Sequence, residues 1–160
     1  MTWLDIVALL VIILVTWVES VRGFGRALFD FVGAVISLRA AAFLAGRLAD
    51  VAPISQSAGP TEAFWFAVMF LALVVLTLLA TRLIYQSTLL SLDVLDPLVG
   101  GLFGLASGMV VAHVFLRIVL LGYTETEFAD VVLSSFMGQE LLKFRTYHKV
   151  VTALHNIGRW

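Results

Sequence analysis

Among the ionisable side chains inside the long apolar stretches of the sequence, three have types and positions that could support chemistry. They are Asp5, Arg39 and His113. An ionisable group inside a membrane-spanning segment is costly, so it normally faces the interior of a helix bundle and has a partner there. We therefore take these three residues as intramembrane polar candidates and ask which kind of site each could form.

Arg39 is the most informative of the three because it lies near the middle of its apolar stretch. At a helical rise of about 1.5 Å per residue, its Cα lies about 6 Å deeper in the membrane than that of Asp5, which is within the reach of an arginine. The functional interpretation is a polar path for an ion or a proton. We favour the structural interpretation, in which Asp5 and Arg39 form an ion pair that fixes the register of two helices.

His113 lies in the last apolar stretch, where an imidazole could ligate a haem or pigment, relay a proton, or form a hydrogen bond to a neighbouring helix. We favour the hydrogen bond. Two further histidines, His148 and His155, are seven residues apart and share one face of a helix. No third ligand has the spacing of a zinc site, so we expect neither a metal site nor a cofactor.

The sequence lacks the residue patterns that mark enzymes. It contains no phosphate-binding loop, no nucleotide fingerprint, no nucleophile spaced with a base, and no cysteine. Its net charge of −1 gives no support for nucleic-acid binding, which normally shows a basic patch. We therefore predict a protein that is not an enzyme, has no catalytic residues and binds no nucleic acid.

The elements that must position the polar candidates are transmembrane helices. Of the 160 residues, 61% are hydrophobic and 13% are charged, against roughly 25% charged in an ordinary soluble domain. Four apolar runs, at 3–18, 27–46, 63–85 and 98–121, could each cross a bilayer as a helix. We predict an all-α integral membrane protein, with a four-helix bundle over residues 1–122 and an amphipathic helical tail over residues 123–160.

Apolar residues at helical spacing predict the amphipathic helix of the tail. They are Leu141, Phe144, Tyr147, Val151 and Leu154. We expect this helix to lie on the bilayer or against the bundle. Gly138 should divide it from a shorter helix that begins near Phe128.

Small residues recur at every fourth position in two of the expected spans. They are Gly33, Ser37 and Ala41 in the second span, and Gly100, Gly104 and Gly108 in the fourth. Such stripes allow two helix backbones to approach closely, which is how many transmembrane helices pack. We predict that the two stripes pack against each other. Asp96 and Pro97 should begin the fourth helix as its N-cap and first residue.

Basic residues indicate the orientation in the membrane. Arg22 and Arg26 lie in the short connection that follows the first span, Arg82 ends the third span, and no lysine or arginine occurs from Ala49 to Glu62. Connections on the cytoplasmic side carry an excess of basic residues. We therefore predict that both termini lie outside the cytoplasm.

Two segments of the sequence resemble the colicin V production protein (CvpA) family, small four-span inner-membrane proteins of bacteria. The first is similar to the family's Trp-x-Asp, apolar span and Arg-Gly-Phe-x-Arg pattern, through Trp3, Asp5, Arg22, Gly23, Phe24 and Arg26. The second resembles the family's Asp-Arg-x-x-Gly-x-x-Phe-Gly-x-x-Arg-Gly signature, through Asp96, Gly100, Phe103, Gly104 and Gly108, with Pro97 and Ser107 at the arginine positions. The resemblance implies a location in the bacterial inner membrane and a link to colicin V production and export, with no established catalytic residues.

Three functions are left open at this point. The first is a non-catalytic, CvpA-like protein that supports toxin (colicin V) production or export. The second is an accessory structural subunit of a larger membrane complex, and the third is a small oligomeric channel. All three predict the lipid bilayer and other membrane proteins as partners, either in a homo-oligomer or in a larger complex.

Overall fold

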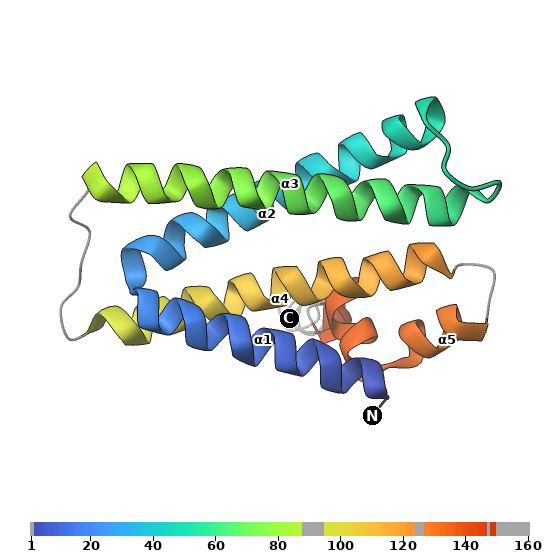
Figure 1. The fold of residues 1–160 in the computed structure, drawn as a ribbon. Coiled ribbons are helices and arrows are strands. Elements are labelled where there is room, and N and C mark those ends of the chain that lie inside the picture. Colours follow the sequence, from blue (N-terminus) through green and yellow to red (C-terminus); the bar gives the residue numbers. More distant parts are fainter. Residues whose placement is uncertain (1, 88–94, 124–126, 147, 150–160) are drawn as a thin grey trace, which may run out of the picture.

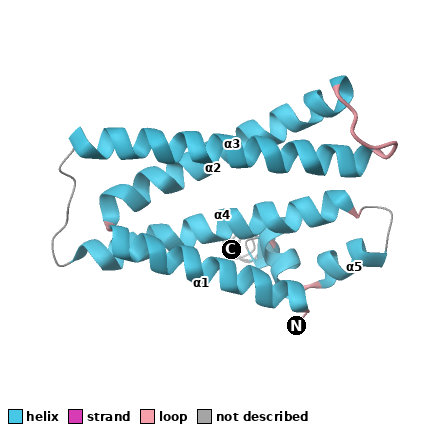
Figure 2. Ribbon diagram, viewed as in Figure 1, coloured by secondary structure: helices cyan, strands magenta, loops and turns pink. Residues whose placement is uncertain are grey.

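The computed structural model describes residues 2–87, 95–123, 127–146 and 148–149, and no strand occurs among them. Four long helices come first: α1 (Trp3–Arg22), α2 (Phe24–Val51), α3 (Ala58–Ser87) and α4 (Asp96–Gly122). The short helix α5 (Glu127–Ser134) and the π-helix η2 (Gly138–Leu142) follow (Figures 1 and 2). Each of the four long helices is long and apolar enough to cross a membrane. The predicted all-α fold of a multi-pass membrane protein is confirmed.

The four long helices pack as two pairs, α1 along α4 and α2 along α3, and α2 also contacts α4 (Figure 1). α1 and α2 are joined directly at Gly23, whose φ of 85° is readily adopted only by glycine. The two helices diverge from this corner, so they contact each other little beyond it. The bundle is therefore built around α4, which touches the other three long helices.

Apolar side chains fill two parts of the bundle interior. Phe66 of α3 and Val114 of α4 pack with small residues of α2 in the first part. Leu4 of α1, Leu116 of α4 and Val132 of α5 are fully or almost fully buried together in the second part. The tail therefore contributes to the packed interior, on the side of α1 and α4.

The glycine stripe of α4 is a close-packing surface, as predicted, but its partner is α1 and not α2. A Cβ atom added to Gly104 would lie 3.0 Å from the Thr16 Cα atom, and one added to Gly108 would lie 2.9 Å from the Ile12 Cα atom. Almost no real Cβ atom has neighbours this close, so only glycine lets the two backbones meet here. The stripe of α2 serves α3 instead, because a Cβ atom on Gly33 would lie 2.9 Å from the Thr77 Cβ atom.

The sequence misled about the partner because a glycine stripe needs no small residues on the helix that it faces. The atoms of Ile12 and Thr16 that lie nearest to the stripe are backbone atoms of α1. Matching two small-residue stripes by their spacing alone therefore identified both close-packing faces but paired them wrongly.

Asp96 caps a different helix from the one predicted. α4 begins at Asp96 with Pro97 in its first turn, so the N-cap residue is Leu95 and not Asp96, and this N-cap makes no side-chain capping bond. The Asp96 Oδ1 atom accepts a hydrogen bond from the backbone N–H of Phe24, at 3.1 Å. The N-terminus of α2 has no acidic residue of its own in the first turn, so a carboxylate from α4 satisfies one of its unpaired N–H groups.

The tail agrees with the prediction at its start and departs from it afterwards. α5 begins at Glu127, one residue before the predicted Phe128, and Gly138 is the first residue of the next element. That element is a π-helix which ends at Leu142, and Phe144 has a positive φ of 49°. Tyr147, Val151, Leu154 and His155 lie outside the described residues.

Candidate functional site

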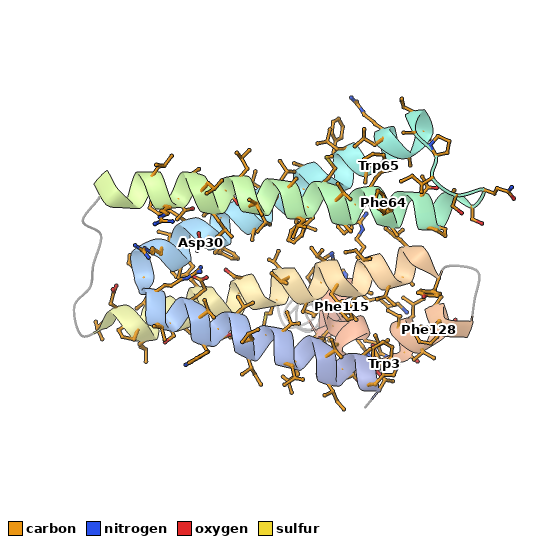
Figure 3. The ribbon with its side chains drawn as sticks, viewed as in Figure 1. Trp3, Asp30, Phe64, Trp65, Phe115 and Phe128 are labelled. Carbon is orange, nitrogen blue, oxygen red and sulfur yellow. The ribbon has the colours of Figure 1, made fainter. Side chains whose placement is uncertain are left out.

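The segment around η2 turns back and packs against α1 and α4. Met137 and Leu141 pack against the cluster of Ala8, Ile12 and Ala112, which lies near the middle of both helices. The rings of Trp3 and Phe128, whose centroids are 6.0 Å apart, hold α5 beside the start of α1 (Figure 3). The tail is therefore a re-entrant segment that reaches the depth of the apolar spans.

Asp5 fixes the start of the re-entrant segment. This side chain is fully buried. Its Oδ1 atom accepts a hydrogen bond from the backbone N–H of Met137 at 2.8 Å, and its Oδ2 atom accepts one from the backbone N–H of Thr2 at 2.7 Å. Both carboxylate oxygens thus accept hydrogen bonds from backbone N–H groups.

The predicted ion pair between Asp5 and Arg39 is not formed. Arg39 is exposed on α2, and no ion pair joins it to any residue in the described part of the chain. The prediction compared the depths of the two residues along their helices. α1 and α2 diverge from Gly23 (Figure 1), so two residues of similar depth far from this corner are separated sideways.

His113 fixes the end of the re-entrant segment. Its Nδ1 atom lies 2.8 Å from the backbone oxygen of Leu141, and since a carbonyl oxygen only accepts, Nδ1 carries the proton. The ring also stacks on Phe144, with 6.4 Å between centroids. This contact is the kind of hydrogen bond favoured from the sequence, but its partner is in the tail.

Ser135 completes this set of polar contacts and was not singled out from the sequence. Its Oγ atom accepts a hydrogen bond from the backbone N–H of Gly138 at 2.9 Å and donates one to the backbone oxygen of Val132 at 2.7 Å. Irregular backbone at membrane depth is tolerated only when its polar groups are satisfied within the protein. We call Asp5, His113 and Ser135 the joint residues, because together they satisfy backbone groups of the re-entrant segment.

A charged cleft of about 510 Å³ lies where α2 begins and α3 ends. Its polar lining residues are Arg22, Arg26, Asp30, Thr81 and Arg82, and its apolar ones are Val75, Leu78 and Leu79. In Figure 3 Asp30 lies on α2 facing α3, at the end of the bundle away from Trp3 and Phe128. The cleft and the re-entrant segment are therefore separate features.

Two buried carboxylates share one arginine beside the cleft. Arg22 Nη1 lies 3.0 Å from Glu19 Oε1 and 3.4 Å from Asp30 Oδ2, and the two acidic side chains are 6% and 9% exposed. The second oxygen of each carboxylate, Glu19 Oε2 and Asp30 Oδ1, is buried and has no hydrogen-bond partner among the described residues. A buried acceptor without a donor is costly, so this cluster is polar beyond the needs of packing.

The sequence pointed to only part of the cleft. Arg22, Arg26 and Arg82 were interpreted as markers of orientation, and Glu19 and Asp30 were not selected. The available signal was an acidic residue on each side of the Gly23 corner, close to Arg22. Helical spacing alone could not show that all these side chains converge after the chain reverses direction.

The two segments that carry the family resemblance lie side by side in the structure. Besides the hydrogen bond from Phe24 to Asp96, the rings of Phe24 and Phe103 pack with 5.7 Å between centroids. Gly100 also packs closely against Glu19 and Gly23 of the first segment. The two patterns therefore describe one structural unit, the corner between α1 and α2 together with the start of α4.

One of the comparisons with known proteins identifies a family. The sequence model described as colicin V production protein matches residues 4–143, which include the re-entrant segment as well as the four spans. No match was found to a curated protein or to a solved structure. Because the family match covers most of the chain, this four-span membrane protein belongs to the colicin V production protein family.

Proposed function

We propose that this chain is a non-catalytic protein of the bacterial inner membrane which supports the production or export of a toxin of the colicin V type. The observation that carries the proposal is the family match over residues 4–143. The chain would act by binding other membrane proteins, either as further copies of itself or within a larger complex. The channel alternative is less favoured, because Asp5 and His113 are bonded to the tail.

Two of the three intramembrane polar candidates, Asp5 and His113, make structural contacts. Asp5 and His113 both bond to the backbone of the re-entrant segment, and that segment packs against both α1 and α4. A conducting path would need polar groups that face a passage and remain available to an ion. The geometry therefore supports a packed, accessory role over conduction.

A toxin assay tests the proposed function. In a bacterium that makes a colicin V-type toxin, deletion of the gene for this chain should reduce the toxin in the medium severalfold, while a plasmid copy should restore it. The zone of growth inhibition measures the secreted toxin, and immunoblots of whole cells measure the toxin retained. A fall in both would indicate production, and a fall in the medium alone would indicate export. Unchanged toxin in both fractions would refute the proposal.

We also propose that the cleft end of the bundle faces the cytoplasm. Arg22, Arg26 and Arg82 all line the cleft, and their gathering at one end supports the positive-inside prediction. Because the chain has no cysteine, single cysteines can report the orientation. A cysteine at Ser57, between α2 and α3, should react with a membrane-impermeant maleimide in intact cells. One at Ser91, outside the described residues, should react only after lysis, and the reverse pattern would invert the orientation.

A further inference from the structure

The charged cleft combines groups that recognise two opposite charges. We propose that it binds the headgroup of a membrane phospholipid that carries both a phosphate and a primary ammonium, as phosphatidylethanolamine does. The cleft of about 510 Å³ falls within the range of roughly 300–1,000 Å³ typical of small-ligand sites. This inference is independent of the proposed role in toxin production.

The arginines supply the phosphate-binding part of the site. Arg22, which pairs with Glu19 and Asp30, lines the cleft together with Arg26 and Arg82, so three guanidinium groups are present there. Guanidinium groups bind phosphate through charge-assisted and often bidentate hydrogen bonds. Basic pockets between transmembrane helices are established sites for phospholipid headgroups.

Asp30 supplies the part that selects an ammonium. Its side chain lines the cleft and is 9% exposed, with Thr81 and Glu19 as polar neighbours. Its Oδ1 atom is buried and accepts no hydrogen bond of good geometry among the described residues. A primary ammonium offers three N–H donors and a positive charge to such an oxygen. The trimethylammonium of choline has the same charge but no N–H donor, and therefore leaves this oxygen unsatisfied.

The apolar wall of the cleft points to a lipid rather than a soluble phosphate ester. Val75, Leu78 and Leu79 of α3 form this wall, and all three are large apolar side chains exposed on the outer surface of the bundle. The surface of a span that faces outward is in contact with acyl chains. A phospholipid can thus place its headgroup among the arginines while its chains remain on the apolar face of α3.

Binding of short-chain lipids to the purified full-length chain tests the proposal. In a maltoside detergent, dioctanoyl-phosphatidylethanolamine should bind about tenfold more tightly than dioctanoyl-phosphatidylcholine, because only the former donates hydrogen bonds to a charged acceptor. Native mass spectrometry measures the affinities. Asp30→Asn should remove this preference, and Arg82→Gln should weaken both lipids. Arg47→Gln, at the other end of α2 where Arg47 stacks on Phe43, is the matched control and should change neither.

Three results would overturn the proposal. Equal binding of the two lipids by the unmodified chain would show that the ammonium is not recognised. Equally tight binding of soluble phosphoethanolamine would make the ligand a free phosphate ester rather than a lipid. Tighter binding of phosphatidylglycerol than of phosphatidylethanolamine would make the site one for anionic lipid. The lipid comparison uses the unmodified chain, so it decides the question even if Asp30→Asn fails to fold.

Discussion

Replacing Gly104 by alanine should destabilise the bundle by about 1–3 kcal/mol, the usual cost of adding a group to a fully packed contact. The new Cβ atom would lie 2.8 Å from the Glu19 Cβ atom and 3.0 Å from backbone atoms of Thr16. Backbone cannot rotate away as a flexible side chain can, so α1 and α4 would have to move apart. The measurement is thermal unfolding of the purified chain in detergent, followed by tryptophan fluorescence.

Gly101 on the same helix provides the matched control. A Cβ atom there would lie 3.6 Å from the Ser20 side chain, which is an ordinary van der Waals distance. Gly101→Ala introduces the same methyl group and the same gain in helix propensity as Gly104→Ala, and it should leave the unfolding temperature unchanged or raise it. Equal stability of the two variants would show that α1 and α4 are not in close contact in the membrane.

The limits of the sequence are clearest at the glycine stripes. Spacing is a local property, so the runs of apolar residues predicted the four spans, and the four-residue period predicted the close-packing face of α4. The partner of that face depends on which helix the chain brings alongside it. Here the single-residue corner at Gly23 and the contact between Phe24 and Asp96 place α1 against α4, and no periodic signal encodes either.

For the polar candidates too, the sequence predicted which residues face the interior but not which groups they contact. The cost of burying Asp5 and His113 predicted that both would face the interior and have partners. Their partners are backbone groups of Met137 and Leu141, and any residue type offers such groups. The sequence therefore contains no pattern that identifies them, and Asp5 was instead assigned to Arg39, the nearest opposite charge in depth. The packing of the tail against α1 and α4 is therefore known only from the structure.

Asp5→Ala should release the re-entrant segment from the bundle. The substitution removes both acceptor oxygens, so the backbone N–H group of Met137 loses its bond to α1. Leaving such a group unsatisfied costs about 1–3 kcal/mol, so opening of the segment should become about tenfold more frequent. The measurement is the rate at which a maleimide labels a single cysteine placed at Leu141, which packs against α1 and α4 in the native chain.

Two controls separate release of the tail from general unfolding and from loss of charge. A cysteine at Ala45, which is 1% exposed in the cluster formed by α2, α3 and α4, should remain slow to react in the Asp5→Ala background. Asp50→Ala, which removes an exposed carboxylate from α2, should not change the rate at Leu141.

The structure also predicts that Asp5→Ala and Arg39→Ala have additive effects on stability, because distant residues without shared partners do not couple. Recovery of stability in the double variant would support an ion pair between Asp5 and Arg39 and would contradict the role of Asp5 in holding the tail. Additive effects, with fast labelling at Leu141 alone, would show that Asp5 acts on the backbone of the tail.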